Sequence, residues 1–248
     1  DFSLKCMRIM TQTTRAKATI SIETSGRAGT VALFLDDEFV EERPLRQAGR
    51  RHAQTLVLEI ADLLQSQDLQ PADCGLVAVS IGPGSFTGLR VGVVFAKTFA
   101  YANRCCVVAV DTFQAVAEGC DCNAENIIVV GEAQRNDVYV GQYLRESAGG
   151  FVRQGTLTIK SVPEFCGSFD QITAAVVTGP AIEKVQSELP SGTPTISADV
   201  GIPRAEWIGR IGLRMIQAGQ EDDVWTLEPF YLRKSAAEEK WDARNPSQ

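Results

Sequence analysis

The sequence predicts an α/β protein built from two similar modules, each a mixed sheet flanked by helices. Short apolar strands alternate with helical segments along the chain, which is the order expected of an α/β fold. Two stretches also share one pattern: a strand that ends in a carboxylate, a polar turn and a returning strand. The first stretch runs from Ile20 to Phe34 and the second from Val129 to Gln142. A duplicated unit explains this likeness; the alternative is a chance match of two hairpins.

The strands and helices of the first half follow from periodicity and composition. Short connections between the first three strands favour antiparallel neighbours. Continuous apolar runs are typical of parallel strands that are covered on both faces, and apolar residues three and four apart predict helices. The expected strands lie at 18–23, 30–35, 38–43, 75–81 and 105–110, and the expected helices at 53–67 and 86–103.

The second half repeats this order with shorter elements. The expected strands lie at 127–132, 138–144, 151–159 and 174–178, with short helices after Asp111 and Pro180 and an amphipathic helix at 204–218. We therefore expect a first module at 18–115 and a second at 116–235. Residues 1–17 are polar and lack the apolar core of a secretory signal, so they and the polar tail at 236–248 are predicted to be loose extensions.

Composition narrows the classes of function. The chain has 248 residues, 44% of them hydrophobic, and a net charge of −7. Because affinity for phosphates depends largely on Lys and Arg, such an acidic chain is expected to meet tRNA only indirectly, through a partner. The sequence contains no apolar run of about 18 residues, which predicts no membrane span and is consistent with a cytoplasmic protein.

Histidine and cysteine content limits the metal chemistry. His52 is the one histidine, so this chain cannot build a site that needs two histidine ligands. The seven cysteines are irregularly spaced, and buried free thiols explain them best. Cys120 and Cys122 lack a second pair at zinc-finger spacing. No metal site is expected, and no serine or cysteine stands beside a base in a recognisable catalytic pattern.

The sharpest local motif is a glycine-rich run, Gly82-Pro83-Gly84-Ser85-Phe86-Thr87-Gly88-Leu89-Arg90, between a strand and a helix. Free amides and the helix dipole converge at such a junction and favour anions. The run is not a Walker A motif, since no Lys-Ser/Thr pair follows Gly88. Two interpretations stay open. The glycines relax a turn that Ser85 caps, or a weak phosphate loop forms from Gly82, Gly84, Ser85, Thr87 and Gly88.

The helix after this run is apolar on nearly every side. Its small residues are spaced by four and form one stripe: Gly88, Gly92, Ala96 and Ala100. A surface helix needs only one apolar face, so something must cover this helix on both sides. Its own sheet is expected on one side. The helix at 53–67 or a separate protein would cover the other.

These motifs resemble the TsaB family, also called YeaZ. The glycine-rich run through Arg90 carries most of the likeness, and the segments ending at Glu23-Thr24-Ser25, Asp111-Thr112, Tyr139 and Arg233 agree with it in order. The resemblance covers about residues 18–235. It implies an actin-like ATPase (ASKHA) fold with two ribonuclease-H-like domains. Glu23 and Glu132 stand where the family usually has Asp, which argues against nucleotide binding in this chain's own cleft.

The resemblance also implies a role without chemistry. Relatives of this kind pair with TsaD, which transfers a threonylcarbamoyl group to adenosine 37 of tRNA and holds a metal with two histidines. The chain is therefore expected to be a non-catalytic dimerisation subunit in tRNA modification. Pairing is implied to use the first module's helices, which gives a predicted interface of Leu56, Ile60, Leu63, Gly88, Gly92, Ala96 and Ala100.

Further partners follow from the same resemblance. A TsaE-like ATPase is the implied third component, and homodimers are expected to use the same surface when the TsaD-like subunit is absent. We expect no cofactor on the chain itself, although a nucleotide could sit at the partner interface.

Three alternatives remain at this point. The chain could be an actin-like ATPase or small-molecule kinase in which Glu23, Asp111 and Glu132 hold Mg²⁺. It could be a protease, for which no catalytic constellation is found. It could also be a self-associating structural protein without an enzyme partner.

Overall fold

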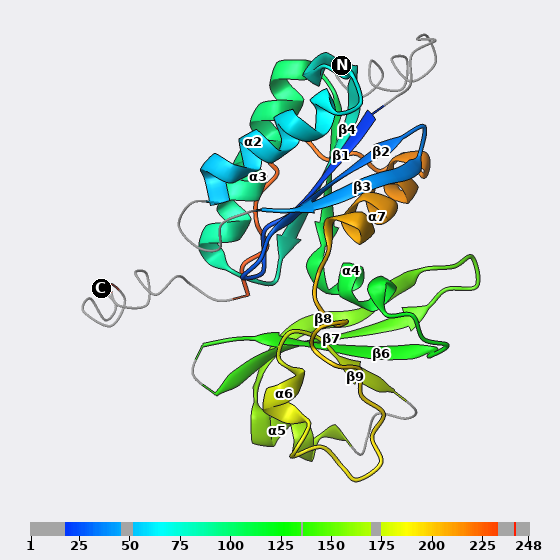
Figure 1. Ribbon diagram of the computed structural model, residues 1–248. Helices are drawn as coiled ribbons and strands as arrows, with labels where there is room; N and C mark the ends of the chain where they lie inside the picture. Colours follow the sequence, from blue (N-terminus) through cyan, green and yellow to red (C-terminus); the bar gives the residue numbers. More distant parts are fainter. Residues whose placement is uncertain (1–17, 46–51, 135, 170–174, 233–240, 242–248) are drawn as a thin grey trace.

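Two modules make up the chain, each containing one sheet, in a computed structural model that describes residues 18–45, 52–134, 136–169, 175–232 and 241 (Figure 1). The predicted extension at 1–17 lies outside the described residues, as does the predicted tail apart from residue 241.

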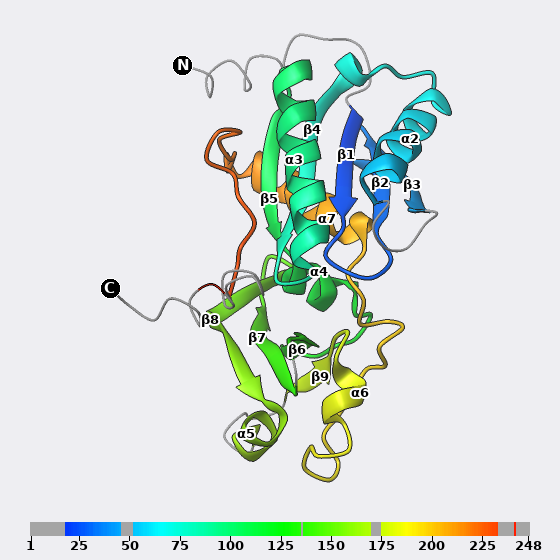
Figure 2. The same ribbon diagram turned by 90° about the vertical axis from the view of Figure 1, so that its left-hand side faces the viewer.

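The first sheet has five strands in the order β3-β2-β1-β4-β5. Strands β1, β2 and β3 pair antiparallel, whereas β1, β4 and β5 pair parallel. The strands are β1 (Ala18–Glu23), β2 (Thr30–Leu35), β3 (Glu38–Pro44), β4 (Cys74–Gly82) and β5 (Cys106–Asp111). The carboxyl ends of β1, β4 and β5 therefore share one edge, which faces the second module (Figure 2).

Helices cover both faces of this sheet. Helices α2 (His52–Gln65) and α3 (Phe86–Asn103) lie side by side on one face, and α7 (Ala205–Gln217) lies on the other (Figures 1 and 2). Each face has its own core, because side chains alternate along a strand. Ile20 and Val79 pack under α2 and α3, whereas Phe34 and Ala78 pack under α7.

The second sheet repeats the strand order of the first with one strand fewer. Its order is β8-β7-β6-β9, with β6, β7 and β8 antiparallel and β9 parallel to β6. The elements are α4 (Thr112–Gly119), β6 (Asn126–Glu132), β7 (Asp137–Arg145), β8 (Phe151–Ser161), α5 (Val162–Gly167), β9 (Val176–Thr178) and α6 (Ile182–Val185). This repetition confirms the predicted mixed-sheet α/β fold with a duplicated unit.

The predicted division at 116–235 is wrong at both ends. At the amino end, the predicted boundary divides α4, which packs against both modules, with Phe113 on the second sheet and Ala115 under α7 on the first. At the carboxyl end, α7 packs on the first sheet through Ile208 and Ile211, next to Phe34. Periodicity showed that α7 is amphipathic, but it does not say which sheet covers the apolar face.

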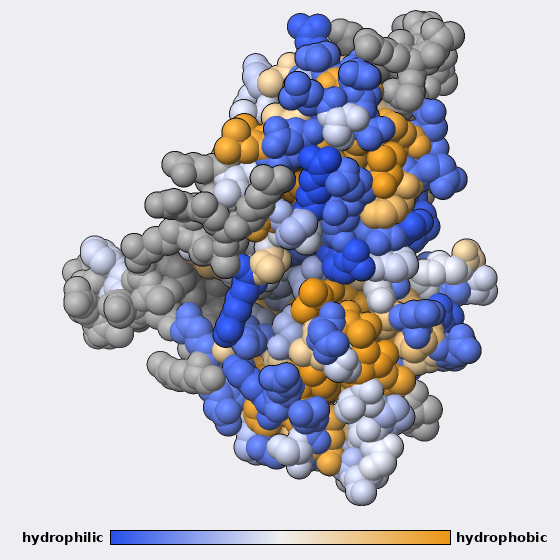
Figure 3. Space-filling model, in the orientation of Figure 1, coloured by the Kyte–Doolittle hydropathy of each residue, from blue (hydrophilic) through white to orange (hydrophobic). Residues whose placement is uncertain are grey.

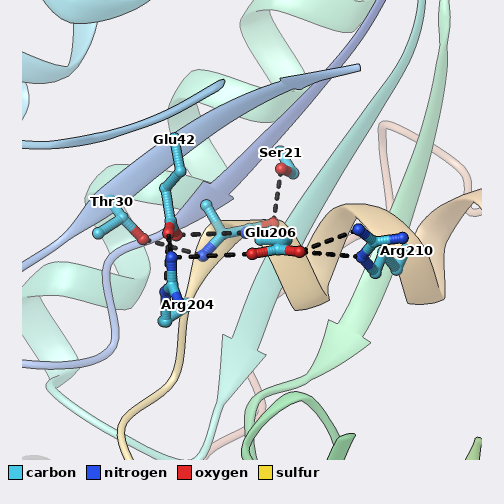
Figure 4. A network of polar contacts seen from close by, with 7 residues as sticks. Ser21, Thr30, Glu42, Arg204, Glu206 and Arg210 are labelled. Carbon is cyan, nitrogen blue, oxygen red and sulfur yellow. Dashed lines mark hydrogen bonds and ion pairs between the residues drawn. The ribbon is translucent and has the colours of Figure 1, made fainter. Parts of the chain in front are cut away.

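A network of charged and hydroxyl groups fixes the start of α7 on the first sheet (Figure 4). Glu42 of β3 accepts hydrogen bonds from the Arg204 guanidinium, at 2.8 Å from Nε, and from the Glu206 amide at 3.3 Å. Thr30 Oγ1 accepts from the Ala205 amide at 2.9 Å, and Ser21 donates to the Ala205 carbonyl at 2.7 Å. The first amides of α7 are therefore satisfied by side chains of the sheet rather than by the helix itself.

After α7 the chain runs back along the first module. The Asp222 amide donates to the Val107 carbonyl at 3.0 Å, and the Asp222 carboxylate accepts from the Ala109 amide at 2.7 Å. Further on, the Phe230 amide donates to the Ile81 carbonyl at 2.7 Å. We call residues 222–231 the C-terminal strap. It lies along the outer edge of β5 and reaches the glycine-rich run.

The cysteines largely follow the expectation of free thiols. Cys74, Cys105, Cys120 and Cys166 are buried and free, and Cys122 is free and half-buried. Burial raises the pKa of both Cys74 and Cys105 to about 12, which makes them poor nucleophiles. Cys106 departs from the expectation, because it takes part in a disulfide bond. In the part of the chain that the structure describes, no helix has both the length and the apolar character that a membrane crossing requires.

The network at α7 predicts a difference between two neighbouring glutamates of β3. Glu42→Ala leaves the Glu206 amide and the Arg204 guanidinium without their acceptor, so we expect it to lower the free energy of unfolding by about 1–2 kcal/mol. Glu41 instead pairs with Arg43 at the surface, so Glu41→Ala should change it by less than about 0.5 kcal/mol. Urea denaturation of both variants measures this, and equal effects would contradict the anchoring role of Glu42.

Candidate functional site

The glycine-rich run forms the junction between β4 and α3, at the carboxyl ends of the parallel strands. Ser85 caps α3, because its hydroxyl accepts from the Gly88 amide at 3.2 Å, as predicted. The Ser85 amide donates to the Ser25 carbonyl at 2.7 Å. The Gly82 amide donates to Thr112 Oγ1 at 3.1 Å. Three amides of the predicted phosphate loop are therefore already used inside the protein.

Close packing of backbones explains two glycines of the run. A Cβ atom on Gly84 would lie 2.6 Å from the Ser25 Cβ, and one on Gly88 would overlap the Thr24 carbonyl. Thr24 Oγ1 in turn donates to the Gly88 carbonyl at 2.9 Å. The family-motif residues Thr24 and Ser25 thus form the surface on which α3 begins. Gly84 and Gly88 are required by this contact, and Thr87 is exposed beside it.

The predicted partner-interface residues are buried inside the chain's own first module, which corrects that prediction. Leu56, Ile60 and Leu63 of α2 belong to the core between helices and sheet. Gly92 faces Ile22 and Val79 of the chain's own sheet, and Thr24 in the turn after β1. Ala96 and Ala100 are fully buried. The small-residue stripe therefore lets α3 lie close to its own sheet, and a second protein cannot reach it.

A different face of α2 and α3 is open. Its exposed apolar side chains are Val57 and Leu58 on α2 and Val94 and Tyr101 on α3, and the exposed Trp225 of the strap lies beside Tyr101. The Tyr101 and Trp225 rings meet edge to face, with centroids 5.3 Å apart. Lys97 holds the strap here by donating to the Trp225 and Leu227 carbonyls at 3.2 and 2.9 Å. We call these five apolar residues the helix face; part of it is visible over α2 in Figure 3.

The helix face could not be predicted from the sequence, for a physical reason. Helix α3 is apolar on nearly all sides, so periodicity could not distinguish its buried stripe from its exposed one. The available signal was size, because small residues are required where a helix approaches a sheet closely. Trp225 gave no signal, since nothing in the sequence shows that the strap returns to α3.

Arg90 of the family motif joins the start of α3 to the strap. Its guanidinium lies 3.9 Å from the centroid of the Phe86 ring, and its Nε donates to the Tyr231 hydroxyl at 3.0 Å. The Phe86 and Tyr231 rings are 4.6 Å apart. This cluster gives Arg90 a structural role, as the residue that fixes the strap beside the glycine-rich run.

Glu23 is a fully buried carboxylate at the end of β1. One oxygen accepts from the Ser25 amide, whereas the other, Oε2, has no hydrogen-bond partner. The hydroxyl of Ser80 on the neighbouring strand is also buried and unpartnered. Burial raises the pKa of Glu23, and the hydrogen bond from Ser25 opposes this shift. A carboxyl group in this position gains from holding a proton, which would allow it to donate a hydrogen bond.

The other two candidate carboxylates have separate partners. Asp111 accepts from the Tyr143 hydroxyl at 2.8 Å and from Arg153 Nη1 at 3.0 Å. Burial raises the pKa of Asp111, and Tyr143 and Arg153 oppose this. Glu132 is exposed and pairs with Arg27 at 3.5 Å. Across the residues the structure covers, no three His, Cys, Asp or Glu side chains gather as a metal site would require.

Comparison with known proteins identifies the family of the chain. A family model described as "TsaD: tRNA N6-adenosine threonylcarbamoyltransferase" matches residues 44–207, well over half of the chain. The chain belongs to the TsaD family.

Within this family, the relatives that match along nearly the whole chain confirm the resemblance to TsaB. The tRNA threonylcarbamoyladenosine biosynthesis protein TsaB of Escherichia coli is 26% identical, covering 89% of this chain and 96% of the relative. Its Bacillus subtilis counterpart is 27% identical, over 90% and 96%. In contrast, the tRNA N6-adenosine threonylcarbamoyltransferase of Streptococcus mutans matches 26% of this chain, at 39% identity.

Solved structures agree on the fold. The crystal structure of YeaZ from Pseudomonas aeruginosa superimposes with a TM-score of 0.77 at 22% identity, over 87% of this chain and 100% of that one. At this level of identity the comparison supports the architecture alone.

The buried carboxyl of Glu23 predicts a characteristic pH dependence. Its pKa lies above the ordinary value of 4.5 in the folded chain, so the folded state binds the proton more tightly than the unfolded state. Stability is therefore lost as pH rises above the ordinary value and through the raised pKa. Glu23→Gln removes this loss and supplies a donor for Ser80.

We expect the Glu23→Gln variant to gain stability relative to the parent as pH rises from about 4.5 to about 8. Urea denaturation of both proteins across this range measures the difference. A difference that stays constant with pH would show that Glu23 does not titrate there.

Proposed function

We propose that this chain is a non-catalytic subunit that pairs with a TsaD-type threonylcarbamoyltransferase, in the formation of N6-threonylcarbamoyladenosine at position 37 of tRNA. The observation that carries the proposal is the match to curated TsaB proteins along nearly the whole chain, within a family whose model is named for the transferase. We assign the threonylcarbamoyltransferase activity in the family name to the partner, because the described residues of this chain do not form a recognisable catalytic site.

Two features support the assignment of catalysis to the partner. The chain has one histidine, His52, so it lacks a pair of histidines to hold a metal. The carboxylates that could serve an actin-like ATPase are separately engaged: Glu23 is buried beside Ser25, and Asp111 is held by Tyr143 and Arg153. We propose that the chain has no cofactor of its own and that any nucleotide sits at the partner interface.

The helix face supports the pairing part of the proposal. Leu58 is 63% exposed, Val94 62% and Trp225 72%, an arrangement that costs free energy in water and favours coverage by a partner. Aromatic side chains such as Tyr101 and Trp225 are frequent among residues that dominate binding energy. An interface of standard size buries about 800 Å² on each partner, which two helices and an adjacent strap can provide.

Additional partners follow from the same proposal. The chain would form homodimers through the helix face when the TsaD-type subunit is absent. A TsaE-like ATPase would bind the assembled pair in the cytoplasm. With a net charge of −7, the chain would meet tRNA only through its partner.

The helix face gives a direct test of pairing. Val94→Glu and Leu58→Glu place a charge at positions that a partner would cover, so each should weaken binding to a purified TsaD-type enzyme at least about tenfold. Both side chains are exposed, so the unfolding transition should stay near that of the parent. Calorimetric titration gives the affinity, and a reconstituted tRNA modification assay should show a parallel loss.

Val152→Glu provides the matched control, because Val152 is an exposed valine of β8 in the second module. It should bind the TsaD-type enzyme as the parent does. If both helix-face variants also bind as the parent does, the assignment of this face to pairing is wrong.

The proposal of catalytic inactivity has its own test, which separates it from an actin-like ATPase or kinase that acts alone. The isolated chain should give no binding heat with ATP and Mg²⁺ and no phosphate release, because its carboxylates are not arranged to hold the metal. Tight binding accompanied by hydrolysis, and abolished by Asp111→Asn, would favour the kinase-like alternative.

A further inference from the structure

Helix α4 lies between the two modules and belongs to the cores of both (Figures 1 and 2). Phe113, Val116 and Ala117 pack against the second sheet. Ala115 instead packs with Ile208 and other residues under α7, on the first module. Any rotation of one module against the other must therefore disturb a buried face of α4.

The amino end of α4 is tied to both sheets by a single carboxylate. Asp111 is the last residue of β5. Its Oδ1 accepts from the Phe113 and Gln114 amides at 2.9 and 3.4 Å, which caps α4. Its Oδ2 accepts from the Tyr143 hydroxyl of β7 and the Arg153 guanidinium of β8, in the second sheet. All four acceptor positions of this carboxylate are used, two within α4 and two across the boundary.

Tyr143 suits this role because it is fully buried. Burial and the neighbouring Asp111 raise the pKa of Tyr143 above its ordinary value, so the hydroxyl keeps its proton and donates. Hydrogen bonds from a neutral donor to a carboxylate are stronger than those between neutral groups.

The carboxyl end of α4 also contacts both modules, through Glu118. We call the contacts of Asp111 the first tie and those of Glu118 the second tie. Glu118 is nearly buried, with 4% of its side chain exposed, and its Oε1 accepts from the Arg214 guanidinium of α7. The same oxygen accepts from the Phe151 amide of β8 at 3.4 Å. Gln114 adds a donor to the Phe151 carbonyl at 2.7 Å. Glu118 therefore connects α7 of the first module with β8 of the second.

We infer that α4 is a fixed joint, which holds the two modules in one relative orientation through ties at both of its ends. One tie alone would leave a pivot, but Asp111 and Glu118 are seven positions apart along α4, which separates the two ties by about 10 Å. Movement about either tie must break the other. Folds of two modules often close by a hinge around a ligand, whereas in this chain closure would have to break the hydrogen bonds that Asp111 and Glu118 accept across the boundary. The inference rests on these contacts and does not depend on the proposed function.

The unmodified protein tests this without any substitution. If the joint is fixed, the Phe113 and Gln114 amides open only on global unfolding, so their hydrogen exchange should be as slow as that of the Val77 and Val79 amides in β4. Exchange at α4 more than about tenfold faster than in β4 would overturn the inference.

Substitutions at both ties should convert the joint into a hinge. Tyr143→Phe removes one donor at the first tie, and Glu118→Gln removes the charge at the second. The matched control, Tyr101→Phe with Glu146→Gln, makes the same chemical changes at exposed positions. Fluorophores introduced at Asp62 on α2 and Glu183 on α6, through non-canonical amino acids, report the distance between modules.

The parent and the control should each show one narrow distance distribution by single-molecule energy transfer. The tie variant should show a broader distribution with a second population, while its unfolding remains cooperative. A broad distribution in the parent, or a tie variant as narrow as the control, would overturn the inference. If the tie variant does not fold, Arg153→Met combined with Arg214→Met replaces it, since these arginines are 40% and 45% exposed and their loss weakens both ties while leaving Tyr143 and Glu118 in place.

Discussion

The contact between the first turn of α3 and the Thr24–Ser25 turn determines the arrangement of much of the first module. The glycines at 84 and 88 allow the two backbones to meet, and Thr24 and Ser25 each exchange a hydrogen bond with the opposite segment. The small residues that follow on α3 continue this approach along the sheet. Because that stripe packs against the sheet, the opposite side of the helix must face outward. The position of Val94 and Tyr101 on the surface is therefore a consequence of where the glycines are.

This arrangement also shows that the amides of the glycine-rich run serve the fold rather than a bound phosphate. A loop of this composition at a helix start can bind phosphate, but its amides here are directed to Ser25, Ser85 and Thr112. Asp111 and Glu132 at the ends of the strands likewise take their partners from the protein itself. The residues of the glycine-rich run thus hold the structure together.

Much of the fold could be predicted from the sequence, because strand and helix periodicity depend on local alternation of apolar residues. The strands at 18–23 and 30–35 and the helix at 86–103 were predicted with the bounds that the structure shows. The pattern of apolar residues could not show which helix covers which sheet. It identified α7 as amphipathic and Leu56 as apolar, but packing against the first sheet depends on contacts distant in sequence. The ties at Asp111 and Glu118 were missed for the same reason.

The C-terminal strap has a consequence for how the first sheet ends. A sheet with an open edge offers unpaired amides and carbonyls, to which a strand of another molecule can add. On the β5 side, Asp222 occupies the Val107 carbonyl and the Ala109 amide. On the β3 side, the edge carries Glu38, Glu41 and Arg43, and charged side chains discourage strand addition. Both borders of the sheet are thus protected against uncontrolled polymerisation, one by a peptide segment and the other by charge.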